Sequence, residues 1–322
     1  MFIYVMGRPH SGSTILDITL GNSVLIESVG ELVSGLGRET TGEHCACGVT
    51  MVDCSYWKRV RHAFAAAGSS ADSMGWDELR ARSVDQAHIT RLPQTLAARR
   101  LTGGLAQLGT TTARLGRAIA VAGGKTHALD SSKEPTRALL LLRFCPDSRV
   151  IHLVRDPRYS VASHYRRFQT GGGYFKFLRR VYRAPYLLVP FMLVAATSWT
   201  VGNLICELVR RFAPERTMRI RYEDLCERPA VEIRRTAEAF GLTLDDLVDM
   251  LQRHDDFTIG HNIGGNRIRH GTTVTFDPKV RTESTLPRWL DLATVALCWP
   301  LMLLYGYRLH SPALSRPAMQ AR

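Results

Sequence analysis

The chemistry suggested by this sequence begins with a glycine-rich turn near its start, Gly7-Arg-Pro-His-Ser-Gly-Ser-Thr14. The spacing is that of a phosphate-binding loop, in which backbone N–H groups at the start of a helix hold a phosphate. Where nucleoside-triphosphate hydrolases carry a lysine, this chain has Ser13. The pattern therefore favours binding of a phosphate over hydrolysis of ATP or GTP. An ordinary strand-to-helix turn is the alternative.

A second candidate binding segment runs from Val150 to Ser163, with the sequence VIHLVRDPRYSVAS. Arg155 leaves the end of an apolar, β-branched run, and Ser163 lies about two turns into the helix expected after it. Arginine can bind a phosphate through two parallel hydrogen bonds while a hydroxyl donates beside it. The segment predicts a second phosphate contact, and the alternative is a surface Arg–Asp turn that caps a helix.

The expected secondary structure places these two segments at one edge of a sheet. Strands are expected at Phe2–Met6, Thr126–Leu129, Arg149–Val154 and Met218–Tyr222, and helices at Thr14–Leu20, Lys133–Phe144, Tyr159–Phe168 and Ala230–Phe240. Strands that alternate with helices indicate an α/β fold with a mostly parallel sheet covered on both faces. Ligands bind such sheets at the carboxyl ends of strands, so both segments can face one ligand.

Together and in this order, the two segments resemble the phosphosulfate loop and the 3′-phosphate segment of sulfotransferases that use 3′-phosphoadenosine 5′-phosphosulfate (PAPS). The strand–turn–helix that starts at Ile220-Arg-Tyr-Glu-Asp-Leu is similar to a later part of the same family. Further segments resemble its bacterial branch: Asp130-Ser-Ser-Lys133, Gly265-Asn-Arg-Ile-Arg269, and Cys45-Ala-Cys-Gly48 with Cys54 and Trp57. The resemblance runs from Met1 to about Arg269, and no motif covers residues 60–125.

The resemblance implies a P-loop-like three-layer fold and transfer of a sulfuryl group from PAPS to a hydroxyl or amine of a small acceptor. Such a transfer needs positioning and charge stabilisation, and no metal is expected to be required. For Arg267 and Arg269, a solvated basic loop is an equally good interpretation. The residues expected to bind PAPS are Arg8, Pro9, His10, Ser11, Gly12, Ser13, Thr14, Arg155, Ser163, Arg267 and Arg269.

The resemblance also indicates which groups carry the chemistry. Many family members place Lys or Arg just ahead of the loop hydroxyls, where this chain has His10. An imidazolium can donate to the bridging oxygen, so the catalytic cation is left open among His10, Arg8 and Lys133; a loop histidine bonded to backbone is the alternative for His10. The base is expected to be Glu31, with Glu27 as the fallback. For Glu31 the alternative is an acid that favours a helix N-terminus.

A compact cluster of possible metal ligands consists of His44, Cys45, Cys47 and Cys54. Three thiolates and an imidazole can complete a tetrahedral zinc site, although Cys-x-Cys is tighter than the usual spacer. Zinc and a disulfide remain open, and packed free thiols are favoured. No catalytic role is expected for the cluster.

The composition contributes a positive charge and two apolar stretches. Lys and Arg number 42 and Asp and Glu 29, a net charge of +13 that attracts polyanions of any kind. Because no motif that reads DNA or RNA is present, no nucleic-acid partner is expected. In the stretches 186–209 and 290–307, polar residues and prolines interrupt the apolar run, so buried core helices are favoured over peripheral docking on a membrane.

The N-terminal apolar run meets Gly7 and Arg8 at once and lacks the order of a secretory signal. We therefore expect a cytoplasmic protein with reduced cysteines, membrane-associated if the apolar stretches dock. The acceptor is expected to be a small molecule, and the apolar content of Tyr174–Val194 favours a lipid or polyketide. The oligomeric state is left open.

One domain, 1–322, is expected, with a helical insertion at approximately 60–125 and an apolar helical tail at 286–322. Two other functions remain as alternatives. A P-loop small-molecule kinase would share the loop, but the missing lysine argues against it. A non-catalytic protein that binds a nucleotide or a membrane would tolerate His10 in the loop.

Overall fold

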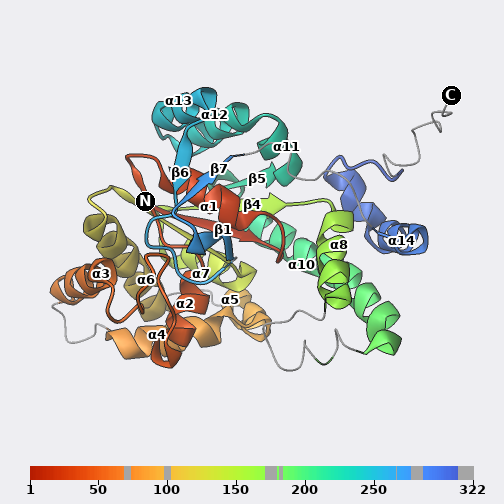
Figure 1. Ribbon diagram of the computed structural model, residues 1–322. Coiled ribbons are helices and arrows are strands. Elements are labelled where there is room, and N and C mark those ends of the chain that lie inside the picture. Colours follow the sequence, from red (N-terminus) through yellow and green to blue (C-terminus); the bar gives the residue numbers. More distant parts are fainter. Residues whose placement is uncertain are drawn as a thin grey trace.

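A parallel sheet of five strands occupies the middle of the computed structural model (Figure 1). The structure describes residues 1–68, 74–97, 103–170, 180, 184–265, 267–276 and 286–310. The strand order is β2-β3-β1-β4-β5, and each neighbouring pair is parallel. The strands are β1 (Phe2–Gly7), β2 (Ile26–Ser28), β3 (His127–Lys133), β4 (Ser148–Val154) and β5 (Thr217–Arg221).

Both faces of the sheet are buried because successive side chains of each strand point to opposite sides. In β1, Tyr4 and Met6 join one hydrophobic core, whereas Ile3 and Val5 join another on the opposite face. A continuous apolar run such as that of β1 therefore suits a strand covered on both sides. The α/β fold with a mostly parallel sheet expected from the sequence is confirmed.

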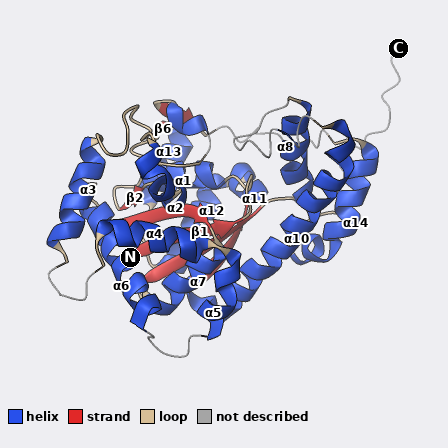
Figure 2. Cartoon of the chain, turned by 90° about the horizontal axis from the view of Figure 1, so that it is seen from below, coloured by secondary structure: helices blue, strands red, loops and turns tan. Residues whose placement is uncertain are grey.

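Helices form the two outer layers (Figure 2). The core around Tyr4 includes side chains from helices that lie between β2 and β4 in the chain and from β1. Its helices are α2 (Leu32–Arg38), α3 (Ser55–Ala66), α4 (Trp76–Ala87), α5 (Leu92–Ala97), α6 (Gly103–Ala122) and α7 (Pro135–Phe144). The opposite face carries α1 (Ser13–Gly21), α11 (Tyr222–Glu227), α12 (Pro229–Phe240) and α13 (Asp245–Arg253).

A third group of helices extends beyond the edge of the sheet and consists of α8 (Pro157–Gln169), α10 (Leu188–Phe212) and α14 (Arg288–Leu304) (Figure 1). The C-terminal half of α10 packs on the sheet through Cys206 and Val209. Its N-terminal half packs against α8 and α14 through Met192, Ala196 and Trp199. One long helix thus joins the sheet to this third group.

Short elements complete the described chain. β6 (Asp256–Thr258) and β7 (Thr273–Thr275) form an antiparallel pair. Single 3₁₀ turns lie at Glu39–Thr41, Ile89–Arg91, Pro185–Leu187, Pro214–Arg216 and Arg267–His270.

The expected elements differ from the observed ones mainly at their ends. The helix predicted from Lys133 starts at Pro135, because β3 continues through Lys133. The three-residue strand β2 was not predicted, since it is too short to show a periodic pattern. In the region 60–125, the helices α3, α4, α5 and α6 share the core of the sheet.

Candidate active site

The glycine loop follows β1 directly, and its conformation depends on two glycines. Gly12 adopts φ 92°, and a Cβ atom there would lie 2.1 Å from the ring of Tyr222. A Cβ atom at Gly7 would lie 2.5 Å from the carbonyl oxygen of Leu153 on β4. Side chains are excluded at both positions, so the loop lies tightly between β4 and the start of α11.

The loop presents donors that lack protein partners. Gly12 is the N-cap of α1 and provides no side chain to cap the first backbone N–H groups of the helix. The hydroxyl of Ser11 is buried and has no hydrogen-bond partner among the described residues. Buried polar atoms are normally paired, so this arrangement fits an anion that would be bound at the loop.

Arg155 extends from the end of β4 onto the glycine loop. Its Nη1 donates to the carbonyl oxygen of His10 at 3.2 Å, and its guanidinium lies 4.3 Å from the ring centre of Tyr222. Its Nε is buried and has no partner in the described part of the chain. The two segments singled out in the sequence therefore meet, because β1 and β4 are neighbours with Gly7 level with Leu153.

A third strand end brings an acid and a base to the same edge. Lys133 is the last residue of β3 and is paired with Met6 of the neighbouring strand β1. It adopts φ 78°. Its Nζ pairs with Glu31, the N-cap of α2. Both side chains are largely buried. Glu31 also accepts a hydrogen bond from the hydroxyl of Ser34 at 3.3 Å. The fallback Glu27 lies on β2 and pairs with Lys125 at 3.4 Å.

His10 is held in an unusual state for a loop residue. It adopts φ 69°, and its ring lies edge-on to that of His164 on α8, with 4.8 Å between centroids. Burial lowers the pKa of His10 to about 2, and the neighbours His164, Arg167 and Lys133 add to the shift. Burial also lowers the pKa of His164 to about 4. Both imidazoles are therefore neutral near neutral pH, until a bound anion offsets the charges of Arg167 and Lys133.

Arg8 turns away from the loop toward α10. Its Nη2 donates to the hydroxyl of Ser198, and a Cβ atom at Gly202 would lie 2.2 Å from its Cδ. The same face of α10 carries Trp199, whose Nε1 donates to the carbonyl oxygen of Arg155 at 3.0 Å. Of the three cations considered from the sequence, Lys133 is the one paired with the expected base.

The α8 helix begins beside Arg155 and carries the expected hydroxyl. Asp156 caps α8 by accepting from the backbone N–H of Arg158, and its own N–H donates to Glu223 at 3.0 Å. Ser163 is half-buried on this helix. The next residue on α8 is His164, whose ring packs edge-on against the ring of Phe191 of α10, with 5.8 Å between centroids. A path of aromatic and imidazole rings therefore leads from the loop to the N-terminal half of α10.

The late basic residues lie elsewhere. Arg269 is buried, and its guanidinium donates to Glu43 at 2.8 Å and to the carbonyl oxygen of His44 at 2.7 Å. Its partners belong to the cysteine-bearing loop rather than to the glycine loop. The backbone of Arg267 starts a 3₁₀ turn, and its side chain is not among the parts of the chain that the structure describes. Pro9 is exposed to solvent, and Thr14 is half-buried on α1.

Sequence reasoning missed three parts of this site. Tyr222 packs on both Gly12 and Arg155, Ser198 binds Arg8, and Gly264 leaves room for Glu31. A usable signal was present in α10, where Trp199, Asn203 and Glu207 follow one another at four-residue spacing in an apolar helix. Residues at that spacing share one face of α10, and this face packs against the rest of the protein. His152 of β4 contacts both Asn203 and Glu207 there.

The glycine loop and the neighbouring strand ends gather, at the carboxyl edge of a parallel sheet, buried donors that have no partner among the described residues and can hold an anion. Residues 3–246, more than half of the chain, match the model of the sulfotransferase family. The chain belongs to this family.

Solved structures of similar fold include several sulfotransferases. The sulfotransferase domain from the curacin biosynthetic pathway is 19% identical, with a TM-score of 0.50 over 96% of this chain and 98% of that chain. The sulfotransferase domain of the Synechococcus olefin synthase is 19% identical over 93% and 94% of the two chains, with a TM-score of 0.47. STF9 from Mycobacterium avium is 12% identical over 96% and 78%, with a TM-score of 0.49. At these identities the likeness concerns the fold alone. No curated protein gives a significant match.

Proposed function

We propose that this protein transfers a sulfuryl group from PAPS to a hydroxyl or amine of a small apolar acceptor. The observation that carries the proposal is the convergence of three adjacent strand ends on one place. β1 leads into the loop, where the Ser11 hydroxyl has no partner among the described residues; β3 supplies Lys133 beside Glu31, and β4 supplies Arg155. This arrangement would provide an anion site, a base and a cation at one edge of the sheet.

The donor would occupy the loop as follows. The N–H groups and hydroxyls of Ser11, Ser13 and Thr14 would hold the 5′-phosphosulfate, and Arg155 with Ser163 would hold the 3′-phosphate. Lys133, already turned into the site, would stabilise the charge that grows on the leaving phosphate oxygen. Arg8 would keep α10 against the loop through Ser198.

These groups alone account for every bond and proton that changes in the proposed transfer. The acceptor oxygen or nitrogen attacks sulfur in line, and its proton passes to the carboxylate of Glu31. The bond between sulfur and the bridging phosphate oxygen breaks, and 3′,5′-adenosine bisphosphate leaves with the electron pair. Glu31 then releases the proton to water.

The apolar character of the acceptor follows from the surroundings of His164. The ring of Phe191 borders it on α10, and Val189, Leu193 and Val194 are exposed on the same half of that helix. Residues 171–179 and 181–183, which hold much of the apolar stretch noted in the sequence, lie outside the described residues. A lipid or polyketide chain would pack well against these apolar side chains.

Calorimetric titration tests the proposed donor. We expect 3′,5′-adenosine bisphosphate to bind at least about tenfold more tightly than ATP–Mg²⁺, because the site has two anion-binding segments and lacks the lysine that contacts the outer phosphates. Transfer from labelled PAPS would then be screened over apolar alcohols, phenols and amines. Preference for ATP–Mg²⁺ would contradict the proposal and favour the kinase. Bisphosphate binding without transfer to any acceptor would favour a non-catalytic binder.

We also propose that the protein works in the cytoplasm at the surface of a membrane. One helix in the described part of the chain, α10, is long and apolar enough to cross a bilayer, with a mean hydropathy of 1.6 and 28% of the apolar window buried. A stripe on α10 is exposed, made of Val201, Leu204, Leu208 and Phe212. The neighbouring α14 exposes Trp289, Leu292, Trp299 and Leu303.

The inward face of α10 favours docking on the membrane over crossing it. Glu207 pairs with Arg219 of β5 at 2.9 Å, and Trp199 bonds to the Arg155 carbonyl. These contacts hold α10 against the sheet, so lipid can reach the outer stripe only. Arg211, Arg288 and Arg308 are exposed at the ends of the two helices, where each would attract an anionic lipid surface by about 1 kcal/mol.

Vesicle binding tests the membrane proposal. With vesicles of phosphatidylglycerol and phosphatidylcholine, we expect the wild-type chain to co-sediment and the double variant V201E/L204E to bind at least roughly tenfold more weakly, because burial of a valine or leucine contributes about 1.5–3 kcal/mol. The control V121E/V231E changes two valines of similar exposure on α6 and α12. Equal binding by both variants, or no binding by the wild type, would contradict docking through α10.

A further inference from the structure

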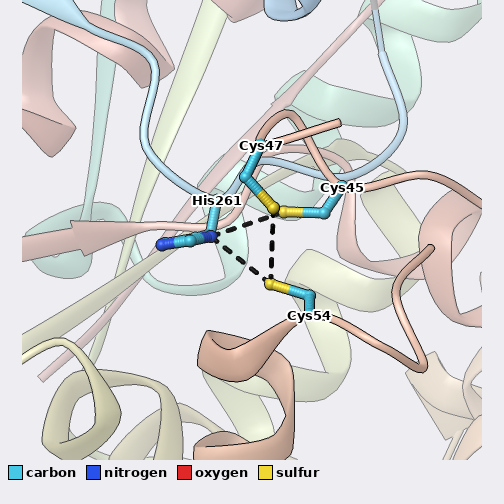
Figure 3. Close-up of side chains that lie close together, drawn as sticks. All are labelled: Cys45, Cys47, Cys54 and His261. Atoms are coloured by element: carbon cyan, nitrogen blue, oxygen red, sulfur yellow. Dashed lines mark hydrogen bonds between the residues drawn. The ribbon is translucent and has the colours of Figure 1, made fainter. Parts of the chain in front are cut away.

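Four side chains that can bind a metal gather beside the cysteine-bearing loop. They are Cys45, Cys47 and Cys54 from that loop and His261 from a segment more than two hundred residues later (Figure 3). Their ligand atoms all lie within 4.8 Å of one another. His44, the histidine expected from the sequence, is exposed, and its carbonyl oxygen accepts from Arg269. The fold therefore supplies a different imidazole from the one adjacent in sequence.

Three distances within this cluster match those around one tetrahedral ion. Nδ1 of His261 lies 3.5 Å from Sγ of Cys45 and 3.4 Å from Sγ of Cys54, and the sulfurs of Cys47 and Cys54 are 3.6 Å apart. Zinc bonds of about 2.3 Å to sulfur and about 2.0 Å to nitrogen place two ligands of a tetrahedron about 3.5–3.8 Å apart. An iron–sulfur cluster would need wider spacing, because its ligands bind different irons.

The surrounding structure holds the ligands in place. The turn at Gly48, with φ 95°, brings Cys45 and Cys47 to one side, and Cys54 is the N-cap of α3. The ring of His261 stacks on Tyr56 with 4.7 Å between centroids, and its carbonyl oxygen accepts from the Trp57 indole at 3.2 Å. Nδ1 thus points into the cluster, as Figure 3 shows. Supporting contacts of this kind are typical of metal sites.

We propose that Cys45, Cys47, Cys54 and His261 bind one Zn²⁺ ion in a closed structural site. Three thiolates and one imidazole are a ligand set that zinc takes in structural sites, and four protein ligands leave no open position for a substrate. The ion does not take part in the transfer. Its role is to join the loop 44–54 to the segment 261–265.

That segment borders the expected base. The backbone N–H of Glu31 donates to the carbonyl oxygen of Ile263 at 2.8 Å, and Ile263 donates to Val29 at 2.9 Å. At Gly264, a Cβ atom would lie 2.8 Å from Cβ of Glu31. The zinc site therefore positions residues that touch Glu31, a consequence that rests on the proposed function, whereas the site itself does not.

Metal analysis of the purified full chain tests the proposal. We expect about one zinc per chain by mass spectrometry, and X-ray absorption with three sulfurs at about 2.3 Å and one nitrogen at about 2.0 Å. Cys47 is exposed, so Cys47→Ser removes a ligand with little loss of packing. In that variant, zinc affinity should fall by more than the roughly 10- to 100-fold that loss of a supporting contact costs. His261→Ala should behave alike.

Cys145→Ser is the matched control, because this buried cysteine donates to the carbonyl oxygen of Gly109 and lies outside the cluster. It should keep its zinc. A thiol titration of denatured, chelator-treated protein should find all seven cysteines reduced. Two fewer thiols would mean a disulfide and would overturn the proposal, as would full thiols without tight zinc binding, or undiminished zinc in Cys47→Ser. These readouts are independent of PAPS, so they separate this site from the proposed transfer.

Discussion

Replacement of Glu31 by glutamine is expected to lower turnover by roughly a hundred- to ten-thousand-fold while nucleotide affinity stays nearly unchanged. The amide keeps the size of the side chain and can still accept from Ser34, but it cannot take the acceptor proton. The effect should appear in kcat, because Glu31 acts in the transfer step. Single-turnover transfer from labelled PAPS, with calorimetry of 3′,5′-adenosine bisphosphate alongside, measures both quantities.

Glu27→Gln provides the control for this prediction. Glu27 is also a partly buried glutamate paired with a lysine, Lys125, but it lies on β2 away from the glycine loop. Its replacement should leave turnover within a few-fold of the wild type. Unchanged turnover in Glu31→Gln would remove Glu31 as the base, and a loss in Glu27→Gln alone would move the role to that residue.

Arg155→Ala is expected to weaken binding of 3′,5′-adenosine bisphosphate by about ten- to a hundredfold. A hydrogen bond to a charged group contributes about 1.5–3 kcal/mol, and each 1.4 kcal/mol is about a factor of ten in affinity. The buried Nε of Arg155, which has no partner in the part of the chain that the structure describes, is available for such a bond. Arg155→Lys should recover part of the loss, since lysine keeps the charge but not the paired geometry.

The control variant changes Arg149, which lies near the other end of β4, the strand that Arg155 follows. Arg149 is half-buried on β4 and donates to the carbonyl oxygen of Ser148. Arg149→Ala removes one positive charge from the strand without touching the loop, so bisphosphate affinity should stay within about twofold of the wild type. Equal losses in the two variants would indicate a general charge effect, and normal affinity in Arg155→Ala would contradict a role in holding the 3′-phosphate.

Local patterns in the sequence predicted most of the frame of this site. The apolar runs at 2–6 and 149–154 predicted β1 and β4, because strands buried on both faces carry apolar residues throughout. The glycines and hydroxyls of residues 7–14 predicted a tight turn into α1, and Gly12 indeed lies where no side chain fits. That both loops leave the carboxyl ends of strands followed from the parallel order.

Contacts between distant segments could not be predicted in the same way. The pairing of Lys133 with Glu31 joins residues about a hundred positions apart, and it depends on β3 lying beside β2, which Glu31 follows. Arg269 was grouped with the donor site by the family resemblance, yet the fold buries it against Glu43. Charge and spacing identify what a side chain can bind, whereas its partner depends on which strands become neighbours.

By itself, the sequence determined the fold class, the glycine-rich turn and the residue types gathered at the sheet edge, because periodicity and turn chemistry act over a few residues. The tertiary structure alone decided that His10 is neutral, since burial and the cations of three other segments set its pKa. It also decided that His261, not His44, completes the cysteine cluster. Each of these depends on desolvation and on contacts made across more than a hundred residues, which no local pattern encodes.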